Sequence, residues 1–246
     1  MDAAAERDRG FSAIDQKIIN SGVRGLSASS NDHVTSPREW RQLMEAFVNA
    51  GKSIDVSDYA EKKKEFSPDE FAIVSDVGSF SESEYVFRNF SHPSMEPVRA
   101  HAPLVYALKY TAKTDQSPRI IGVVSFRLDL KNQLVLIEQI QGGNTAAPFL
   151  SRPAEEYAAR KQFRGANPEY ALYDAVRQFA LACNFQGIGI RKGISSDDKK
   201  VSKRAERGIE TLYDKVALHA NHAQHSPFTG GDLDEYTFEE LTMTQA

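Results

Sequence analysis

The sequence predicts one α/β domain, built on a mixed, largely antiparallel sheet that helices flank, and three observations support this prediction. Three apolar or alternating runs follow one another between residues 102 and 141, separated by short polar breaks, as in an antiparallel meander. A helix with a clear start follows at Asn167–Pro168. The apolar segment GIGI at 187–190 and a further helical pattern then complete an order of strand, helix, strand and helix.

The first hundred residues are expected to lie outside this core. Residues 1–35 are polar and rich in small side chains, so we expect a flexible leader with at most one short amphipathic helix. Residues 36–100 are expected to form an N-terminal helical extension, which begins at SPRE with an N-cap serine, a proline in the first turn and a glutamate three positions on. A similar signal at 67–70 is followed only by FAIV, so a helix there should be short or absent. The α/β core is expected over residues 101–246.

The third run of the meander, QLVLIEQIQ at 133–141, contains a candidate general base. Strict alternation places Glu138 on one face with Leu136 and Ile140, and Gln139 on the other. Partial burial would suit Glu138 to accept a proton from an amine. The alternative is a carboxylate that is paired, or that reaches solvent at a sheet edge.

The helix after the meander has an N-terminus suited to an anion. Asn167 can act as N-cap, and Pro168 fits the first helical position because its missing N–H would have no partner there. The free N–H groups of this helix lie next to Arg164 and Gly165 in the sequence, so a phosphate could bind there. The Asn-Pro pair also accounts for the helix start without any ligand.

Composition and charge narrow the classes of function. The 246 residues have a formal net charge of −4, which disfavours nucleic-acid binding over the whole surface. No stretch approaches the roughly 20 apolar residues that span a bilayer, and MDAAAERDRG lacks the apolar segment of a Sec signal peptide. We therefore expect a cytoplasmic protein, or one secreted without a Sec signal as bacterial effectors are. The single Cys183 falls on an apolar helix face and is expected to be a buried thiol.

Two other patterns point to weaker possibilities. Histidines recur at 219, 222 and 225, but zinc needs three or four ligands of fixed geometry, so we expect no metal site. Between residues 191 and 207, seven Lys or Arg residues outnumber three Asp or Glu residues. This local excess leaves binding of RNA or a lipid headgroup as a third hypothesis.

The predicted order of elements resembles that of the GNAT acyltransferases. In that family a central strand splays from its neighbour, and a Q/R-x-x-G-x-G/A loop at the next helix holds the pyrophosphate of acyl-CoA. The segment QFRGAN matches this motif at its first and fourth places but has Asn167 at the sixth, and a loop of about twenty residues precedes it. The resemblance implies that acyl-CoA is the cofactor and that its pyrophosphate is cradled by Gln162, Arg164, Gly165 and Asn167.

The segment TLYDKV at 211–216 resembles the GNAT helix whose tyrosine protonates the departing thiolate. The resemblance implies that Tyr213 is the general acid, which would act together with Glu138, the candidate general base named above. A packing role is the alternative for Tyr213. The function implied is that of an acyl-CoA-dependent N-acyltransferase acting on an amine of a protein or small molecule.

A closer resemblance, to the VirK/YbjX family, covers about Leu104 to Phe238. It rests on IEQIQGG, RGANPEYALYDAVRQFALA, GIGI and LYDKVA, which match in order and approximate spacing. The chain departs from that family in having Asn167 in place of an arginine and in lacking a late tryptophan. Members are associated with bacterial virulence and envelope function. This resemblance implies an alternative function, that of a non-catalytic accessory or effector protein that binds a protein partner.

Overall fold

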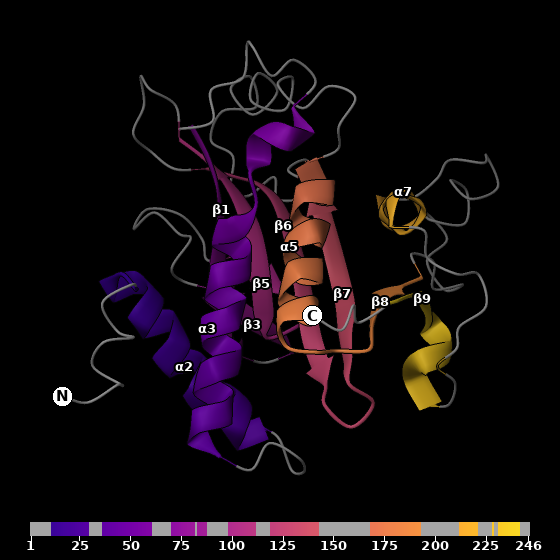
Figure 1. Ribbon diagram of the computed structural model, residues 1–246. Coiled ribbons are helices and arrows are strands. Elements are labelled where there is room, and N and C mark those ends of the chain that lie inside the picture. Colours follow the sequence, from indigo (N-terminus) through magenta and orange to yellow (C-terminus); the bar gives the residue numbers. More distant parts are fainter. Residues whose placement is uncertain are drawn as a thin grey trace.

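The main feature of the fold is a six-stranded mixed sheet of order β1-β5-β6-β7-β8-β9 (Figure 1). Neighbouring strands run antiparallel except β7 and β8, which are parallel. The predicted α/β class with a largely antiparallel sheet is thus confirmed. The strands are β1 (Phe71–Val77), β5 (Leu104–Tyr110), β6 (Arg119–Asp129), β7 (Leu134–Gly142), β8 (Gly187–Arg191) and β9 (Tyr236–Glu240). The computed structural model describes residues 11–29, 36–60, 70–81, 83–87, 98–111, 119–142, 168–192, 212–220, 228 and 231–241.

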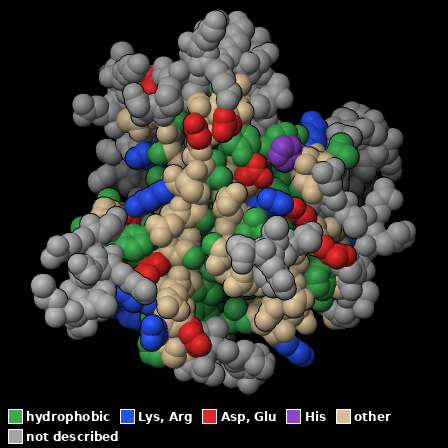
Figure 2. Space-filling model, in the orientation of Figure 1, with side chains coloured by type: hydrophobic (Ala, Val, Ile, Leu, Met, Phe, Trp, Pro, Cys, Tyr) green, Lys and Arg blue, Asp and Glu red, His purple; other side chains and the backbone are tan. Residues whose placement is uncertain are grey.

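Helices cover one face of this sheet. Helices α3 (Pro37–Ser53) and α5 (Pro168–Ala182) lie side by side over the strands, and α2 (Ala13–Ser29) packs on α3 (Figure 1). Helix α7 (Leu212–His219) lies beside the upper part of β7 in this view. Acidic and basic side chains are interspersed over this face of the described residues (Figure 2). Within the described residues, no helix is long and apolar enough to cross a membrane.

The opposite face of the sheet, called the back face below, has two covers. The first is a small antiparallel sheet of order β2-β3-β4, which packs its apolar side chains against β5 and β6. The second is the 3₁₀ turn η5 (Gly231–Glu235), whose Leu233 packs with β7 and β9 side chains. The small sheet consists of β2 (Ser79–Ser81), β3 (Glu84–Phe87) and β4 (Val98–Ala100).

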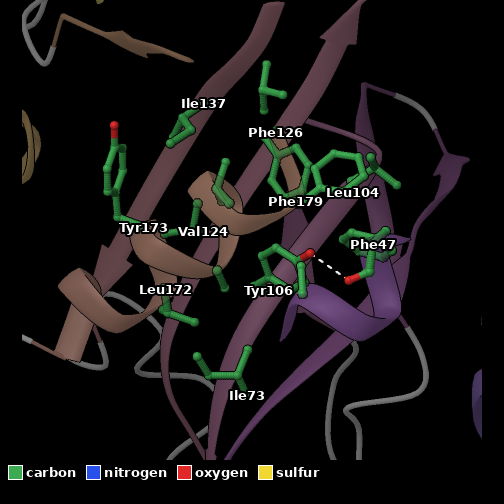
Figure 3. Close-up of a cluster of buried hydrophobic side chains, with 14 of the residues drawn as sticks. Phe47, Ile73, Leu104, Tyr106, Val124, Phe126, Ile137, Leu172, Tyr173 and Phe179 are labelled. Carbon is green, nitrogen blue, oxygen red and sulfur yellow. Dashed lines mark hydrogen bonds between the residues drawn. The ribbon is translucent and has the colours of Figure 1, made fainter. Parts of the chain in front are cut away.

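The core between sheet and helices is centred on aromatic rings. Phe126 of β6 lies 5.5–5.8 Å, centroid to centroid, from the rings of Phe47, Tyr106 and Phe179 (Figure 3). All four side chains are fully buried. The hydroxyl of Tyr106 donates a hydrogen bond of 2.6 Å to the carbonyl oxygen of Phe47. A buried phenol thus has the partner it requires.

Several elements follow the sequence prediction closely. The three meander runs form β5, β6 and β7, and the helix predicted to start at Pro168 does so. The capping box at the start of α3 is present, since Ser36 accepts from the Glu39 N–H and Glu39 accepts from the Ser36 N–H. Local signals of this kind need only neighbouring residues, so they can be read without knowledge of the fold.

The described residues between 71 and 100 differ from the expected helical extension, because they form strands β1 to β4. Strand β1 pairs with β5 from Phe71↔Tyr110 to Val77↔Leu104 and so belongs to the main sheet. Its side chains at Phe71 and Ile73 are buried in the main core. This strand pairs with one some thirty residues later, and that pairing outweighs the local helix-start signal. A prediction from short stretches of sequence cannot anticipate such a long-range contact.

A β-bulge in β7 changes which of its residues share a face. The register with β6 pairs Ser125 with Gln139 and the next residue of β6 with Ile137, so Glu138 is the extra residue. Ile140 consequently joins Ile137 in the core beneath the helices. The expectation of strict alternation, which placed Ile140 with Glu138, is therefore wrong here.

Helix α2 occupies part of the expected leader, and an ion pair fixes it to α3. Asp15 is buried and contacts the ammonium group of Lys52. It also accepts hydrogen bonds of 2.8 Å from the backbone N–H and the hydroxyl of Ser12, which precedes the helix. Burial alone would raise the pKa of Asp15, but the hydrogen bonds from Lys52 and Ser12 and the Lys52 charge outweigh it and lower the pKa below 3.8.

Replacing Asp15 with alanine is expected to lower the free energy of unfolding at pH 7 by about 1–2 kcal/mol, through loss of the capping interaction and the half-exposed ion pair. Because the folded pKa is lowered, this contribution is present above the unfolded pKa and disappears as the pH falls through the folded value. Urea unfolding of both proteins at pH 7 and pH 3 measures it. A difference of the same size at both pH values would contradict the assignment.

Candidate functional site at the divergence of two parallel strands

The two parallel strands separate partway along their length. Strand β7 pairs with β8 only from Leu134↔Gly187 to Ile137↔Ile190. Strand β7 then continues to Gly142, whereas β8 ends at Arg191. Ligands of α/β proteins commonly bind beyond the carboxyl ends of parallel strands, where backbone groups lack a neighbouring strand. This divergence is therefore the first place to look for a site.

Tyr213 of α7 contacts β7 beyond the paired region. Its hydroxyl oxygen accepts a hydrogen bond of 3.2 Å from the backbone N–H of Ile140. A hydroxyl has two lone pairs and one proton, so this contact leaves its O–H available to donate. Burial raises the pKa of Tyr213 and exceeds the lowering by the Ile140 N–H and the Arg191 charge. The phenol is thus protonated at neutral pH.

Glu138, the bulge residue, lies at the same divergence and accepts hydrogen bonds from three side chains. Its carboxylate accepts hydrogen bonds from Arg127 Nε at 2.6 Å, from the Tyr236 hydroxyl at 2.6 Å and from Arg191 Nη1 at 3.3 Å. Its side chain is 8% exposed. Of the two interpretations of Glu138, the paired carboxylate describes what the structure contains. Within the described residues Oε1 accepts two of these bonds and Oε2 accepts only the one from Arg191, so Oε2 is the oxygen with room to accept a proton.

The partners of Glu138 extend to the turn before β9. Arg127 also contacts Asp232, and Arg191 donates to Glu235 at 2.9 Å. Burial alone lowers the pKa of Arg127, but its hydrogen bonds to Glu138 and Tyr236 raise it above the ordinary value. Burial and the hydrogen bond to Glu138 raise the pKa of Tyr236 to about 12. We call this set the Glu138 network: Arg127, Glu138, Arg191, Asp232, Glu235 and Tyr236.

The structure brings the two predicted catalytic residues into one region. The charges of Glu138 and Arg191 both act on the pKa of Tyr213. The four predicted cofactor-binding residues lie outside the described residues: Gln162, Arg164, Gly165 and Asn167.

Of the six members of the Glu138 network, only Glu138 was predicted as a site residue. Arg127, Arg191 and Tyr236 join Glu138 from β6, β8 and β9. Arg191 and Tyr236 are separated from Glu138 by 53 and 98 residues. Arg191 did have a local signal, since it directly follows the predicted strand GIGI and so lies at the carboxyl end of β8. Tyr236 had none, because its partner depends on how the sheet is assembled.

Cys183 and His219 are two further candidate groups among the described residues. Cys183 has a pKa raised to about 12 by burial, so its thiol is protonated and unreactive at neutral pH. His219 stacks on Tyr170 at 4.0 Å between ring centroids, and its Nε2 lies 4.0 Å from Asp174. Among the residues that the structure places, no three metal-binding side chains come together. His222 and His225 are not among those residues.

No protein-family model matches the chain, and no curated protein is significantly similar to it in sequence. Functional inference therefore depends on the residues at the divergence.

Replacing Glu138 with glutamine is expected to lower the free energy of unfolding by about 1–3 kcal/mol. Removing one partner from a buried pair costs more than this, about 3–5 kcal/mol, but the arginine side chains here are 34% and 47% exposed and can be solvated. The matched control is Glu84→Gln, whose partner Arg99 is 3.8 Å away at the surface. It should change stability by less than about 0.5 kcal/mol. Equal effects in urea unfolding would show that the Glu138 network contributes no special stability.

Proposed function

We propose that the protein is an acyl-CoA-dependent N-acyltransferase that acts on an amine of a protein or small molecule. The observation that carries the proposal is the divergence of β7 and β8, with the Tyr213 hydroxyl held at the backbone N–H of Ile140. A tyrosine at the carboxyl ends of two parallel strands agrees with the resemblance to GNAT acyltransferases that the sequence indicated.

The proposed chemistry assigns each described residue one task. Acyl-CoA supplies a thioester whose carbonyl carbon is attacked by the amine nitrogen, with cleavage of the carbon–sulfur bond. Tyr213 donates its hydroxyl proton toward the departing sulfur, since within the described residues its oxygen accepts from the Ile140 N–H and its O–H donates to no partner. Glu138 accepts the proton released by the amine, directly or through a water, at Oε2, which within the described residues accepts only the bond from Arg191. Gln162, Arg164, Gly165 and Asn167 would hold the pyrophosphate before α5.

Binding of the cofactor can be tested without knowing the acceptor. Acetyl-CoA or a longer acyl-CoA, at about 100 times its dissociation constant, should stabilise the protein by roughly 2.7 kcal/mol, which corresponds to a rise in Tm of about 5–10 °C. Arg164→Ala should reduce the rise, whereas Arg99→Ala, on β4, should leave it unchanged. If no acyl-CoA changes the Tm and Arg164→Ala behaves as the unmodified protein, the enzyme proposal fails.

A second proposal is that the chain is a non-catalytic accessory or effector protein of the VirK type, which uses the scaffold to bind a protein partner. The observation that favours it is the engagement of Glu138 by three donors, which leaves the carboxylate poorly placed to act as a base. Under this proposal acyl-CoA does not bind, and Glu138 has a structural role. The melting experiment above therefore separates the two.

A further inference from the structure

Arg127 and Arg191 form a pair of guanidinium groups that one buried acid holds together. Both donate to the carboxylate of Glu138, Arg127 through Nε and Arg191 through Nη1. Tyr236 donates to the same carboxylate and is itself buried. Two like charges are kept side by side because the carboxylate between them is shielded from water and cannot easily be replaced.

The other acidic partners of the two arginines are much more exposed than Glu138. Asp232, which contacts Arg127, is 64% exposed, and Glu235, which contacts Arg191, is 59% exposed. Ion pairs at such exposure change an equilibrium constant by no more than about fivefold. Asp232 and Glu235 can therefore be exchanged for another anion, whereas Glu138 stays in place.

The two arginines also have unused hydrogen-bonding capacity. Within the part of the chain that the structure describes, Arg127 Nη1 and Arg191 Nε donate no hydrogen bond. Guanidinium groups bind carboxylate and phosphate oxygens through paired N–H donors. Arg191 is the last residue of β8, so its guanidinium group lies where β7 and β8 separate. It is also close enough to Tyr213 for its charge to lower the pKa of that phenol.

We propose that Arg127 and Arg191 form an anion-binding site for a carboxylate or phosphate group, which Asp232 and Glu235 occupy until the ligand replaces them. The ligand class follows from the proposed function: the acceptor is a small amine that also carries an acidic group, bound by the arginines with its nitrogen toward Glu138 and Tyr213. The anion site itself does not depend on that function.

Inorganic phosphate tests the site on the full chain without acyl-CoA. At constant ionic strength, phosphate should produce saturable changes in the backbone amide NMR signals of β8 and η5. Arg191→Gln should weaken binding by about tenfold or more, through loss of a charged hydrogen-bond donor. The double variant Asp232→Asn, Glu235→Gln should tighten binding by up to about fivefold for each competitor removed. Arg99→Gln is the matched control, since Arg99 is 53% exposed on β4 and pairs with Glu84 instead.

Absence of saturable phosphate binding would overturn the proposal, and so would binding that neither Arg191→Gln nor the double variant alters. The double variant retains both arginines, so it keeps the test decisive if Arg191→Gln proves unstable. The acceptor class is tested by acylation of phosphoethanolamine against ethanolamine, and equal rates would refute it. A chain that binds phosphate but no acyl-CoA would refute the proposed function and leave the anion site standing.

Discussion

Replacing Phe126 with alanine is expected to lower the free energy of unfolding by about 3–5 kcal/mol, a large part of the 5–15 kcal/mol typical of a folded domain. The ring is fully buried and lies between α3, α5 and the sheet, in contact with Phe47, Tyr106 and Phe179. Its removal leaves a cavity that three rigid rings and a strand cannot close. Both the lost burial and the cavity therefore contribute.

The control for this prediction is the same substitution at a surface position. Phe80 of β2 is 66% exposed, so Phe80→Ala should change stability by less than about 0.5 kcal/mol. Unfolding in urea can be followed by the fluorescence of the single Trp40, which is buried in the same core. A loss below about 1 kcal/mol for Phe126→Ala would mean that the aromatic cluster is not the centre of the fold.

The part of the fold that could be predicted consists of elements with local signals. Helix α5 starts at Pro168, where the sequence has an Asn-Pro pair typical of a helix start, and β7 matches an apolar run that follows a short polar break. Strand β1 was missed because its pairing with β5 is a long-range contact, and the sequence before it carries a helix-start signal. Strands β2 to β4 are too short for an alternation of apolar and polar residues to be recognised in the sequence.

The sequence pointed to two residues of the candidate site. Glu138 and Tyr213 were both identified, and the charge of Glu138 does act on Tyr213. The bulge that makes Glu138 the extra residue of β7 was not foreseen, because a bulge interrupts the alternation on which the prediction depended. The arginines around Glu138 come from other strands. The sequence alone therefore left open whether Glu138 is a general base or a paired carboxylate.

Replacing Tyr213 with phenylalanine should lower kcat for acyl transfer by about 100-fold or more, the usual contribution of a positioned general acid. Binding of acyl-CoA should remain, because the ring and its packing are retained. Stability should fall by only about 1 kcal/mol, the value of the hydrogen bond from the Ile140 N–H. Single-turnover kinetics and the Tm shift with acyl-CoA measure the two effects separately.

Tyr59→Phe supplies the matched control, since it also removes one tyrosine hydroxyl that has a hydrogen-bond partner, here Asp174. Its hydroxyl is engaged by α5 and not by the divergence of β7 and β8, so kcat should be unchanged although stability falls. The comparison is decisive because a purely structural Tyr213 would behave as Tyr59 does. If both variants lose stability and neither loses kcat, Tyr213 only satisfies the Ile140 N–H, and the general acid must be sought elsewhere.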